Sequence, residues 1–469
     1  MKKLLYIFLA AILTGGLTGC KKYLDKLDNP NLVTDPPLNG LLAQGTYRTG
    51  YSVFEMGDIT SYYVQYLAGN TKGSDADVYN PVDYSSTWSD SYASMMNIKQ
   101  MILKAQTDRA WLHLGVGQVL MALNLNMLIN TFGDVPYSNA LEGKNNIIPT
   151  FDKQQALHDT CQALLDAAIT NLQRTDASLK LDAGSDVIHT GDAAAWLKSA
   201  YALKARFLNQ WSKTSSYNAT GILTALGNAY TSNADDAALL SFNGRSPWNG
   251  VAYNNTQLDL DGWLSTQIVN AMNGTNYPLK DPRLPRIASI TKYGDYRGTQ
   301  NGAGRIGTGT NQEESYLSVT GFYSATNAPL LIVTYAETKF IEAEAALRSG
   351  DPGRAYDAYL DGIRANMDKV GVAAADRDAY VNDPGVSVGQ ANISLDLIFK
   401  EKYVAMLLNP EAWVDARRYD YKYRNFSLPV GAAMPTFIRR LNYPTIEISR
   451  NASNIPPVKG LDEKLVWDQ

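Results

Sequence analysis

The stretch that decides the fold is residues 331–369, which read LIVTYAETKFIEAEAALRSGDPGRAYDAYLDGIRANMDK. Its apolar and small side chains recur in steps of three and four, the spacing that places them on one face of a helix. The residues that share this face are Ala336, Phe340, Ala343 and Leu347. The spacing therefore predicts a helix over residues 331–349.

A turn and a second helix are predicted to follow directly. Gly350 stands where a helix end tolerates a positive φ, Asp351 can cap the next helix, and Pro352 fits its first turn. The second helix is expected to run to about Lys369, with one face formed by Ala355, Tyr359 and Ile363. The pair spans about 36 residues, which is close to the tetratricopeptide unit of about 34 residues.

The same periodicity extends along most of the chain. Helices are predicted at residues 88–106, 109–131, 152–173, 192–213 and 394–408, with a short one from Trp413 to Tyr419. Between Leu38 and Ala68 we expect helices that are broken by three glycines, Gly45, Gly50 and Gly57. Since no clean repeat array is visible, residues 88–131 and 152–213 are interpreted as degenerate helix pairs. The fold class is therefore mainly α, with tetratricopeptide-like helix pairs as its scaffold.

Residues 231–330 differ from the rest because they are rich in Gly, Asn, Thr and Tyr and have only short apolar runs. We expect irregular loops there, a short helix near 263–273 and a small hairpin near 315–323. A segment of this length without strong periodicity usually carries function in a compact protein. This loop-rich insertion is therefore the expected location of a ligand site.

The N-terminus has the three parts of an export signal. Met1-Lys2-Lys3 is a positive start, and Leu4 to Leu13 is an uncharged run that is too short to span a bilayer. Cys20 follows Leu17-Thr18-Gly19, which is the pattern of a bacterial lipobox. An ordinary secretory signal with a chance cysteine is the alternative.

This pattern predicts the domain organisation. Residues 1–19 would be a signal peptide, and the mature chain would be held at a membrane by acyl chains on Cys20, which give stable anchoring. Residues 20–40 are rich in Asp, Asn and Pro and predict an extended tether. Residues 41–469 would then form a single α-helical domain.

Composition limits the classes of partner. Lys and Arg number 42 against 46 Asp and Glu, a formal net charge of −4, which argues against a nucleic-acid partner. Beyond the signal, no apolar run is expected to be long enough for a transmembrane helix. Cys161 is interpreted as a small buried hydrophobe. Stability must therefore come from a packed core and not from disulfides.

Familiar motifs are mostly excluded by their context. Residues 302–307, GAGRIG, match a dinucleotide fingerprint, but no strand precedes them and no helix follows, so a surface loop is predicted. Residues 257–262 resemble a calcium loop whose twelfth position is Ile268 and not a glutamate, which excludes an EF-hand. A looser structural calcium site at Asp259 and Asp261 stays open; no other metal or cofactor is expected.

No sequence signal of catalysis is present. His113, His158 and His189 stand alone, so a catalytic zinc site is not expected. No nucleophile elbow, phosphate-binding loop or Cys-His pairing appears. The sequence therefore favours a protein that is not an enzyme.

Aromatic usage indicates a recognition surface. The chain has 29 Tyr and 8 Trp against 11 Phe, and polar-tipped rings can pack on one side and meet a ligand on the other. Any single ring more often belongs to the core, but two or more rings of the set are expected to contact ligand. The candidate ligand-binding residues are Trp248, Tyr253, Trp263, Tyr293, Tyr296, Arg297, Tyr316, Tyr323, Tyr79, Asp83 and Trp88, of which Trp88 could instead begin the helix at 88–106.

Several segments, in this order, resemble one known family. They are 131–137 (TFGDVPY), 331–337 (LIVTYAE), 340–345 (FIEAEA), 398–403 (IFKEKY), 409–418 (NPEAWVDARR) and 438–444 (IRRLNYP), followed by Glu447 and Asn451. Together with the lipobox they closely resemble the SusD/RagB family of Bacteroidetes outer-membrane lipoproteins, in particular its subgroup described as starch-binding. Within these motifs, we expect Trp413 to stack with Arg417 and Asp415 to pair with an arginine, both as scaffold.

The resemblance implies a fold, a partner and a function. It implies one α-rich domain that acts as the lid of a SusC-type TonB-dependent transporter, captures nutrients and releases them unaltered. It also implies an outer-membrane location that faces the cell exterior. Family members exported to the surface often have acidic residues directly after the lipidated cysteine, whereas here residues 21–24 (KKYL) precede the first acid, Asp25. The exterior placement therefore depends on the family resemblance and not on this export signal. An oligosaccharide is the first expectation for the ligand. Peptides or amino acids in the same architecture, a surface glycoside hydrolase and a helical adaptor without ligand are the alternatives.

Overall fold

The helix pair predicted from residues 331–369 is present. In the computed structural model, which describes residues 35–177 and 179–469, helix α12 (Tyr335–Arg348) is followed by helix α13 (Pro352–Lys369). Gly350 has a φ of 84°, and the side chain of Asp351 accepts a hydrogen bond from the Arg354 amide at 3.0 Å. The turn and both caps therefore form as local sequence predicts.

The first part of this stretch is a strand and not a helix. Residues Leu330–Val333 form β6, which pairs antiparallel with β4 (Ala237–Leu239). The run of Leu, Ile and Val favours a buried strand. Thr334 then starts α12 by accepting a hydrogen bond from the Glu337 amide at 3.2 Å. The prediction of a helix over 331–349 is corrected to a strand followed by a helix.

The two helices of the pair approach each other closely at one glycine. A Cβ atom added at Gly362 on α13 would lie 3.0 Å from the ring carbons of Phe340 on α12. Both residues are buried, and Phe340 is one of the residues predicted on the shared face. A side chain at position 362 would push the helices apart.

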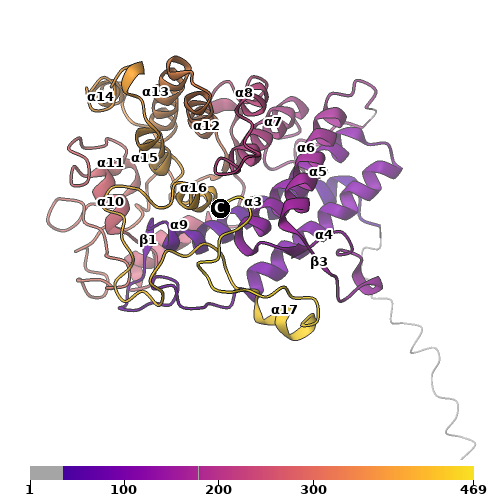
Figure 1. The fold of residues 1–469 in the computed structure, drawn as a ribbon, viewed down its shortest axis with the longest axis horizontal. Coiled ribbons are helices and arrows are strands. Elements are labelled where there is room, and N and C mark those ends of the chain that lie inside the picture. Colours follow the sequence, from indigo (N-terminus) through magenta and orange to yellow (C-terminus); the bar gives the residue numbers. More distant parts are fainter. Residues whose placement is uncertain (1–34, 178) are drawn as a thin grey trace, which may run out of the picture. The chain divides into compact units, whose positions relative to one another are not determined.

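The N-terminal half supplies further packed helices in sequence order. These are α3 (Leu38–Tyr63), α4 (Ser85–Thr107), α5 (Trp111–Phe132), α6 (Gln154–Leu172), α7 (Ala193–Asn209) and α8 (Ala219–Leu226). Consecutive helices pack on one another from α3 to α8. Figure 1 shows α4, α5 and α6 on one side of α3, with α12 and α13 above and α10 and α11 on the other side. The mainly α fold with tetratricopeptide-like helix pairs is confirmed.

Helix α3 is continuous, although three glycines were expected to break it. It runs from Leu38 to Tyr63 through Gly45, Gly50 and Gly57. These glycines allow other segments of the chain to pack closely against α3. A Cβ atom at Gly57, for example, would collide with the carbonyl oxygen of Leu408. The cost of glycine in a helix is offset here by tight packing against the C-terminal part of the chain.

Among the described residues, helix α5 is the one long helix that is apolar over most of its length. By length and composition it could cross a membrane, which corrects the expectation that no run would be long enough. However, 89% of its most apolar window is buried inside the protein. It is enclosed by neighbouring helices, and Cys161 of α6 is likewise buried, as predicted. Helix α5 is therefore a core helix of the bundle.

The loop-rich insertion carries short elements. These are η2 (Asn233–Asp235), β4, α9 (Pro247–Gln257), β5 (Trp263–Leu264), α10 (Thr266–Met272) and α11 (Leu284–Ile287). Strand β5 pairs with β1 (Leu67–Ala68), and β2 (Val135–Pro136) pairs with β3 (Phe151–Asp152), both antiparallel. Residues 302–307 form a loop, as predicted.

The hairpin expected near 315–323 is not formed. Tyr316 makes an isolated bridge to Trp263, and Leu317 makes one to Ala288. Both partners lie far along the chain, so this segment joins separate parts of the insertion instead of folding on itself. The helix expected at 263–273 is correspondingly shorter, because its first two residues form β5.

The C-terminal part adds four helices and a set of buried ion pairs around Arg418. The helices are α14 (Ala374–Val381), α15 (Leu395–Ala405), α16 (Glu411–Arg418) and α17 (Thr445–Arg450), and the remaining short turns are η1 (Gly143–Asn145) and η3 (Gln390–Asn392). Arg417 lies over the Trp413 ring at 3.8 Å, as predicted. Asp415 pairs with Arg418 at 2.6 Å, and Arg418 also pairs with Glu344 at 2.7 Å. These motif residues are scaffold.

Residues Leu38–Gln469 form one compact unit. The predicted signal peptide (1–19), the lipidation site Cys20 and most of the tether (20–40) lie outside the described residues. The division of the chain at residue 40 therefore stays a prediction.

Candidate functional site

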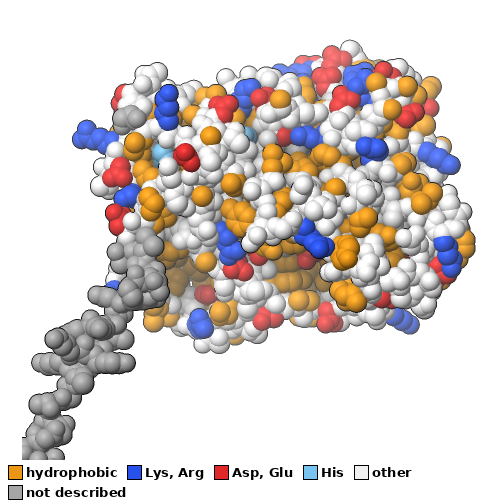
Figure 2. All heavy atoms as spheres, turned by 180° about the vertical axis from the view of Figure 1, so that it is seen from behind, with side chains coloured by type: hydrophobic (Ala, Val, Ile, Leu, Met, Phe, Trp, Pro, Cys, Tyr) orange, Lys and Arg blue, Asp and Glu red, His pale blue; other side chains and the backbone are white. Residues whose placement is uncertain are grey.

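A cleft of about 450 Å³ lies where the loop-rich insertion meets the C-terminal helices. The surface is uneven, and the view from behind shows a further hollow in the lower half of the molecule (Figure 2). We refer to the first as the Tyr277 cleft. It is lined by Tyr277, Pro278, Leu279, Tyr359, Asp383, Gly385, Val386, Asp396, Leu397, Lys400, Tyr419, Lys422, Tyr423 and Arg424.

The segment that follows α16 forms one wall of the cleft. Asp420 and Tyr421 have φ values of 51° and 54°, a left-handed conformation that costs about 1–3 kcal/mol for each such residue. Burial of Tyr421 holds this turn in place: its hydroxyl accepts a hydrogen bond from Trp413 Nε1 at 2.8 Å and donates one to the Ile438 carbonyl. The turn places Tyr419 and Tyr423 on the cleft.

The rings of this wall are fixed by stacking. Tyr419 lies parallel to Phe399, with centroids 4.4 Å apart and planes at 6°. Tyr423 lies 5.2 Å from Tyr419 and 4.6 Å from the buried Tyr403. The Tyr419 hydroxyl donates a hydrogen bond to Asp396, at the start of α15. A half-buried phenol is thereby held with a carboxylate beside it.

Tyr277 forms the opposite wall and comes from the insertion. The guanidinium of Arg424 lies 4.9 Å from its ring centroid, and Lys400 Nζ lies 5.1 Å from it. Arg424 Nη1 donates to the Asn276 carbonyl at 3.0 Å, and Asn425 Nδ2 donates to Asn276 Oδ1 at 2.9 Å. These bonds fix the insertion to the segment after α16.

Beneath the cleft lies a buried ionic cluster. Glu401 pairs with Lys400 and with Arg283, the latter at 2.5 Å, and Arg283 also pairs with Asp281 at 2.5 Å. Burial alone would raise the pKa of Glu401, but Lys400 and Arg283 outweigh burial and hold that pKa well below its ordinary value. This cluster is electrically satisfied and stiffens the floor.

Within the described part of the chain, four charged groups at the mouth of the cleft lack an ion-pair partner, although most of them form hydrogen bonds. Among the described residues, no ion pair engages Asp383, Asp396, Lys422 or Arg424. Carboxylates accept hydrogen bonds, and guanidinium and ammonium groups donate them. Flat rings beside such groups match a sugar, which has apolar faces and a rim of hydroxyls. The volume lies in the range of about 300–1,000 Å³ typical of small-molecule sites.

Six of the predicted rings are core residues. Trp263 packs under Arg305, whose guanidinium lies 3.4 Å from its ring centroid, and Trp88 packs edge-on against Phe132 at 5.0 Å. The buried set is Tyr79, Trp88, Trp248, Trp263, Tyr316 and Tyr323, each at most 4% exposed. The expectation that these rings face a ligand is corrected, because the helices, strand and loops that carry them direct the rings into the protein interior.

The other predicted residues are accessible but do not share one pocket. Tyr293 and Arg297 lie together, with the guanidinium 4.2 Å from the ring centroid, and Tyr296 is half-buried nearby in sequence. Tyr253 is 44% exposed beneath Arg245. Asp83 lines a separate, mostly apolar cavity of about 540 Å³. Ligand binding by these residues stays a prediction.

Sequence reasoning missed the principal residues of the Tyr277 cleft. One signal could have found part of it: Tyr419-Asp420-Tyr421-Lys422-Tyr423-Arg424 alternates rings with charges. Tyr277 and Asp396 carry no such signal, since each becomes a cleft residue only through contacts with distant segments.

Comparison with known proteins gives the family. The family model described as "Starch-binding associating with outer membrane" matches residues 30–444, which is most of the chain. The chain belongs to the SusD-like family. No curated protein matches this SusD-like chain.

Solved structures share the SusD-like fold. A SusD/RagB family protein from Bacteroides thetaiotaomicron has a TM-score of 0.75 and 22% identity, and the match covers 92% of this chain and 99% of that one. A chitin-binding SusD homologue from Flavobacterium johnsoniae has a TM-score of 0.76 and 20% identity, with coverage of 91% and 98%. A further chitin-binding protein has a TM-score of 0.76 and 22% identity, with coverage of 92% and 100%.

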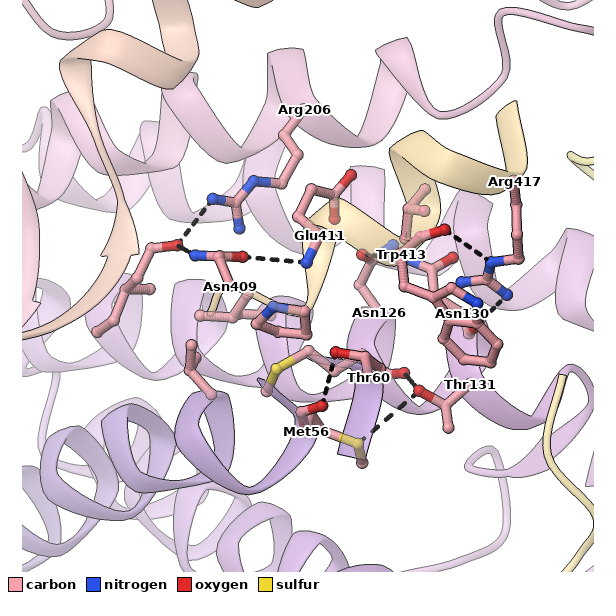
Figure 3. Close-up of a pocket in the computed structure, with 16 residues that line it drawn as sticks. Met56, Thr60, Asn126, Asn130, Thr131, Arg206, Asn409, Glu411, Trp413 and Arg417 are labelled. Atoms are coloured by element: carbon pink, nitrogen blue, oxygen red, sulfur yellow. Dashed lines mark hydrogen bonds between the residues drawn. The ribbon is translucent and has the colours of Figure 1, made fainter. Parts of the chain in front are cut away.

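A second, internal cavity of this SusD-like chain is too small for a sugar. It measures about 20 Å³, room for about one water molecule, and lies between α3, α5, α7 and the Asn409–Arg417 segment (Figure 3). Arg417 Nη1 donates to the Asn130 carbonyl at 2.7 Å across one end. Burial raises the pKa of Glu411 to about 7. These family-motif residues hold the core together and do not contact the surface.

The candidate calcium residues are engaged by the protein itself. Asp259 Oδ1 accepts a hydrogen bond from Arg305 Nη1 at 2.8 Å, and Asp261 accepts from the Asn70 amide at 2.8 Å. Within residues 35–177 and 179–469, no three His, Cys, Asp or Glu side chains are grouped to hold a metal. A calcium site at Asp259 and Asp261 stays a prediction.

Proposed function

We propose that the protein binds an oligosaccharide in the Tyr277 cleft and releases it unaltered. The observation that carries this proposal is the pair of fixed rings, Tyr277 and Tyr419, which line the cleft beside carboxylates and cations that form no ion pair among the described residues. The family description as starch-binding, and the chitin-binding relatives of the same fold, support a glycan as ligand.

The delivery step is part of the proposal. The ligand would pass to a SusC-type TonB-dependent transporter, for which this protein would serve as the lid. It would be held by lipid at Cys20 on the outer membrane and face the cell exterior. The family's description as associating with the outer membrane supports this location. Co-purification of the full chain with a barrel protein from the native membrane would test the partnership.

Calorimetric titration with starch and chitin oligosaccharides tests the binding. We expect a Kd between about 1 µM and 1 mM. Tyr277→Ala should weaken it about tenfold or more, because it removes a stacking face. Tyr201→Ala, which removes a half-buried ring of α7 outside the cleft, is the matched control. Equal loss in both variants would contradict the site, and release of shorter sugars by the pure protein would instead indicate a glycoside hydrolase.

A peptide ligand is the second candidate, and the cleft has one feature that favours it. Two carboxylates (Asp383, Asp396) and two cations (Lys422, Arg424), without ion pairs among the described residues, lie around the same cavity, as the two ends of a short peptide would require. Binding of short peptides without sugars in the same titration would select this candidate.

We also propose that the protein needs neither a catalytic cofactor nor calcium. Asp259 is paired with Arg305, and Asp261 accepts hydrogen bonds from the Asn70 amide and the Ser74 hydroxyl.

A further inference from the structure

Helix α3 carries one accessible face that the proposed function does not use. From Tyr47 to its end, all but seven residues of α3 are buried. The seven recur at helical spacing and therefore lie along one side of the helix. They are Tyr47, Arg48, Tyr51, Phe54, Glu55, Asp58 and Tyr62, and we call them the α3 row. At about 1.5 Å per residue the row is about 22 Å long.

Aromatic rings form the first part of the α3 row. Tyr47 and Tyr51 are stacked, with centroids 6.2 Å apart and planes at 18°. Phe54 follows at 5.6 Å from Tyr51 and packs edge-on against the buried Trp248 at 4.8 Å. The ring surface is continuous and is fixed from below by α9.

Two carboxyl groups lie beside these rings without a partner. Glu55 and Asp58 are three residues apart on the helix, so they are neighbours on its surface. Within the part of the chain that the structure describes, neither forms a hydrogen bond or an ion pair. The neighbouring cation Arg48 is committed to Asp90 of α4 at 2.8 Å. The charge of both carboxyl groups is therefore left unbalanced.

The groups that face the two carboxyls increase this imbalance. Glu55 is faced by Asp90 from α4 and by Arg48, and Asp58 by Asp261 from the loop before β5. The phenols of Tyr62 and Tyr84 also face Asp58. Burial, and then these acids, raise the pKa of Glu55 to about 7 and that of Asp58 to about 6. Apart from Arg48, every group named here is acidic or neutral.

A ligand for this face must satisfy three conditions. It must be extended, because the row is long; it must offer apolar faces to the rings; and it must carry positive charge for the carboxyls. A bound metal ion does not meet the second condition, and no grouping of three metal-binding side chains is found among the described residues.

We propose that the α3 row is a second glycan site, which binds saccharide chains that carry free amino groups. The sugar rings lie on Tyr47, Tyr51 and Phe54, and ammonium groups pair with Glu55 and Asp58. This site is separate from the Tyr277 cleft and does not depend on the function proposed for the cleft.

The test uses two oligosaccharides of equal length, a glucosamine oligomer and its fully acetylated counterpart, titrated into the full mature chain. The glucosamine oligomer should bind more tightly than its acetylated counterpart, because only its ammonium groups can pair with Glu55 and Asp58. Glu55→Gln with Asp58→Asn should weaken its binding about tenfold or more. The acetylated oligomer should be little affected.

The matched control is Asp357→Asn with Asp376→Asn, which removes two exposed and unpaired acids elsewhere. This control should bind the glucosamine oligomer like the natural chain. Equal loss in control and test variants, or equally tight binding of oligolysine, would overturn the proposal in favour of unspecific charge attraction. Tyr51→Ala is a second variant that keeps the charges and should still weaken binding.

Failure of this proposal is distinguishable from failure of the first. Tyr277→Ala should leave binding of the glucosamine oligomer to the α3 row unchanged while it weakens binding of neutral sugars to the cleft. If Tyr277→Ala removes both, the α3 row is not a separate site. Thermal unfolding of each variant shows whether it is folded; Glu55→Gln with Asp58→Asn should not lower the Tm, because no contact is lost.

Discussion

The ring of Tyr419 lies flat on that of Phe399, with 4.4 Å between centroids, while the Tyr419 hydroxyl is bonded to Asp396. One side chain thus joins the aromatic and the acidic parts of the Tyr277 cleft. The stack positions the ring, and the hydrogen bond orients the carboxylate. The two roles can be separated by mutation.

Tyr419→Phe keeps the stack and removes the hydroxyl. We expect this variant to weaken oligosaccharide binding about fivefold, the value of one hydrogen bond of about 1 kcal/mol. Tyr419→Ala removes the ring as well and should weaken binding about tenfold or more. Calorimetric titration with the same sugar measures both. Identical affinities of the two variants would show that the ring face makes no contact with ligand.

His158 is expected to make stability depend on pH. It is buried edge-on against Trp211, and burial lowers its pKa to about 3. Because the unfolded chain binds this proton near pH 6.5 and the folded chain does not, stability is full above about pH 6.5 and declines by about 1.4 kcal/mol per unit as the pH falls towards 3. His158→Leu should reduce this slope in urea unfolding between pH 6.5 and 4.5. An unchanged slope would show that His158 takes up its proton in the folded state.

Gly57 should tolerate no side chain. A Cβ atom there would collide with the Leu408 carbonyl oxygen, which is backbone and cannot rotate away. Gly57→Ala should therefore lower the free energy of unfolding by about 1–3 kcal/mol.

Gly250→Ala is the matched control for this substitution. Gly250 also lies within a helix, α9, and has open space around its Cβ position, so the alanine should stabilise by about 1 kcal/mol. Chemical unfolding of both variants gives the comparison. A Gly57→Ala protein as stable as the natural one would mean that α3 can shift away from Leu408.

Calcium should not affect stability. Since Asp259 is bonded to Arg305, and Asp261 to Asn70 and Ser74, an added ion would have to displace existing hydrogen bonds. We expect the same Tm in 5 mM EDTA and in 5 mM calcium chloride (concentrations of about 5 mM far exceed a tight Kd). A rise of several degrees with calcium, lost in Asp259→Asn, would establish a structural ion.

The fold was predictable where the sequence acts locally. The turn between α12 and α13 rests on Gly350, Asp351 and Pro352, three neighbours whose conformations need no distant partner. Strand β6 was missed because its pairing with β4 joins residues about ninety positions apart, and an apolar run of four cannot be told from a helix start by periodicity alone.

The site was less predictable, for a related reason. Trp263 and Tyr277 belong to the same loop-rich insertion, yet one is covered by Arg305 and the other lines the cleft. Composition indicates that rings are plentiful, but exposure is decided by which segment lies on top of each ring. The sequence predicted the irregular loops and short elements of the insertion, but it could not show which of its rings would be exposed.

The bonds from Arg424 and Asn425 to Asn276 join positions separated by about one third of the chain. A polypeptide that crosses a membrane from its N-terminus onward therefore emerges with one wall of the Tyr277 cleft long before the other exists. If the chain is exported and binds a ligand as proposed, the cleft cannot hold that ligand until the last segment has arrived. For the same reason, a fragment that stops short of residue 425 would lack part of this wall and should not bind the proposed ligand.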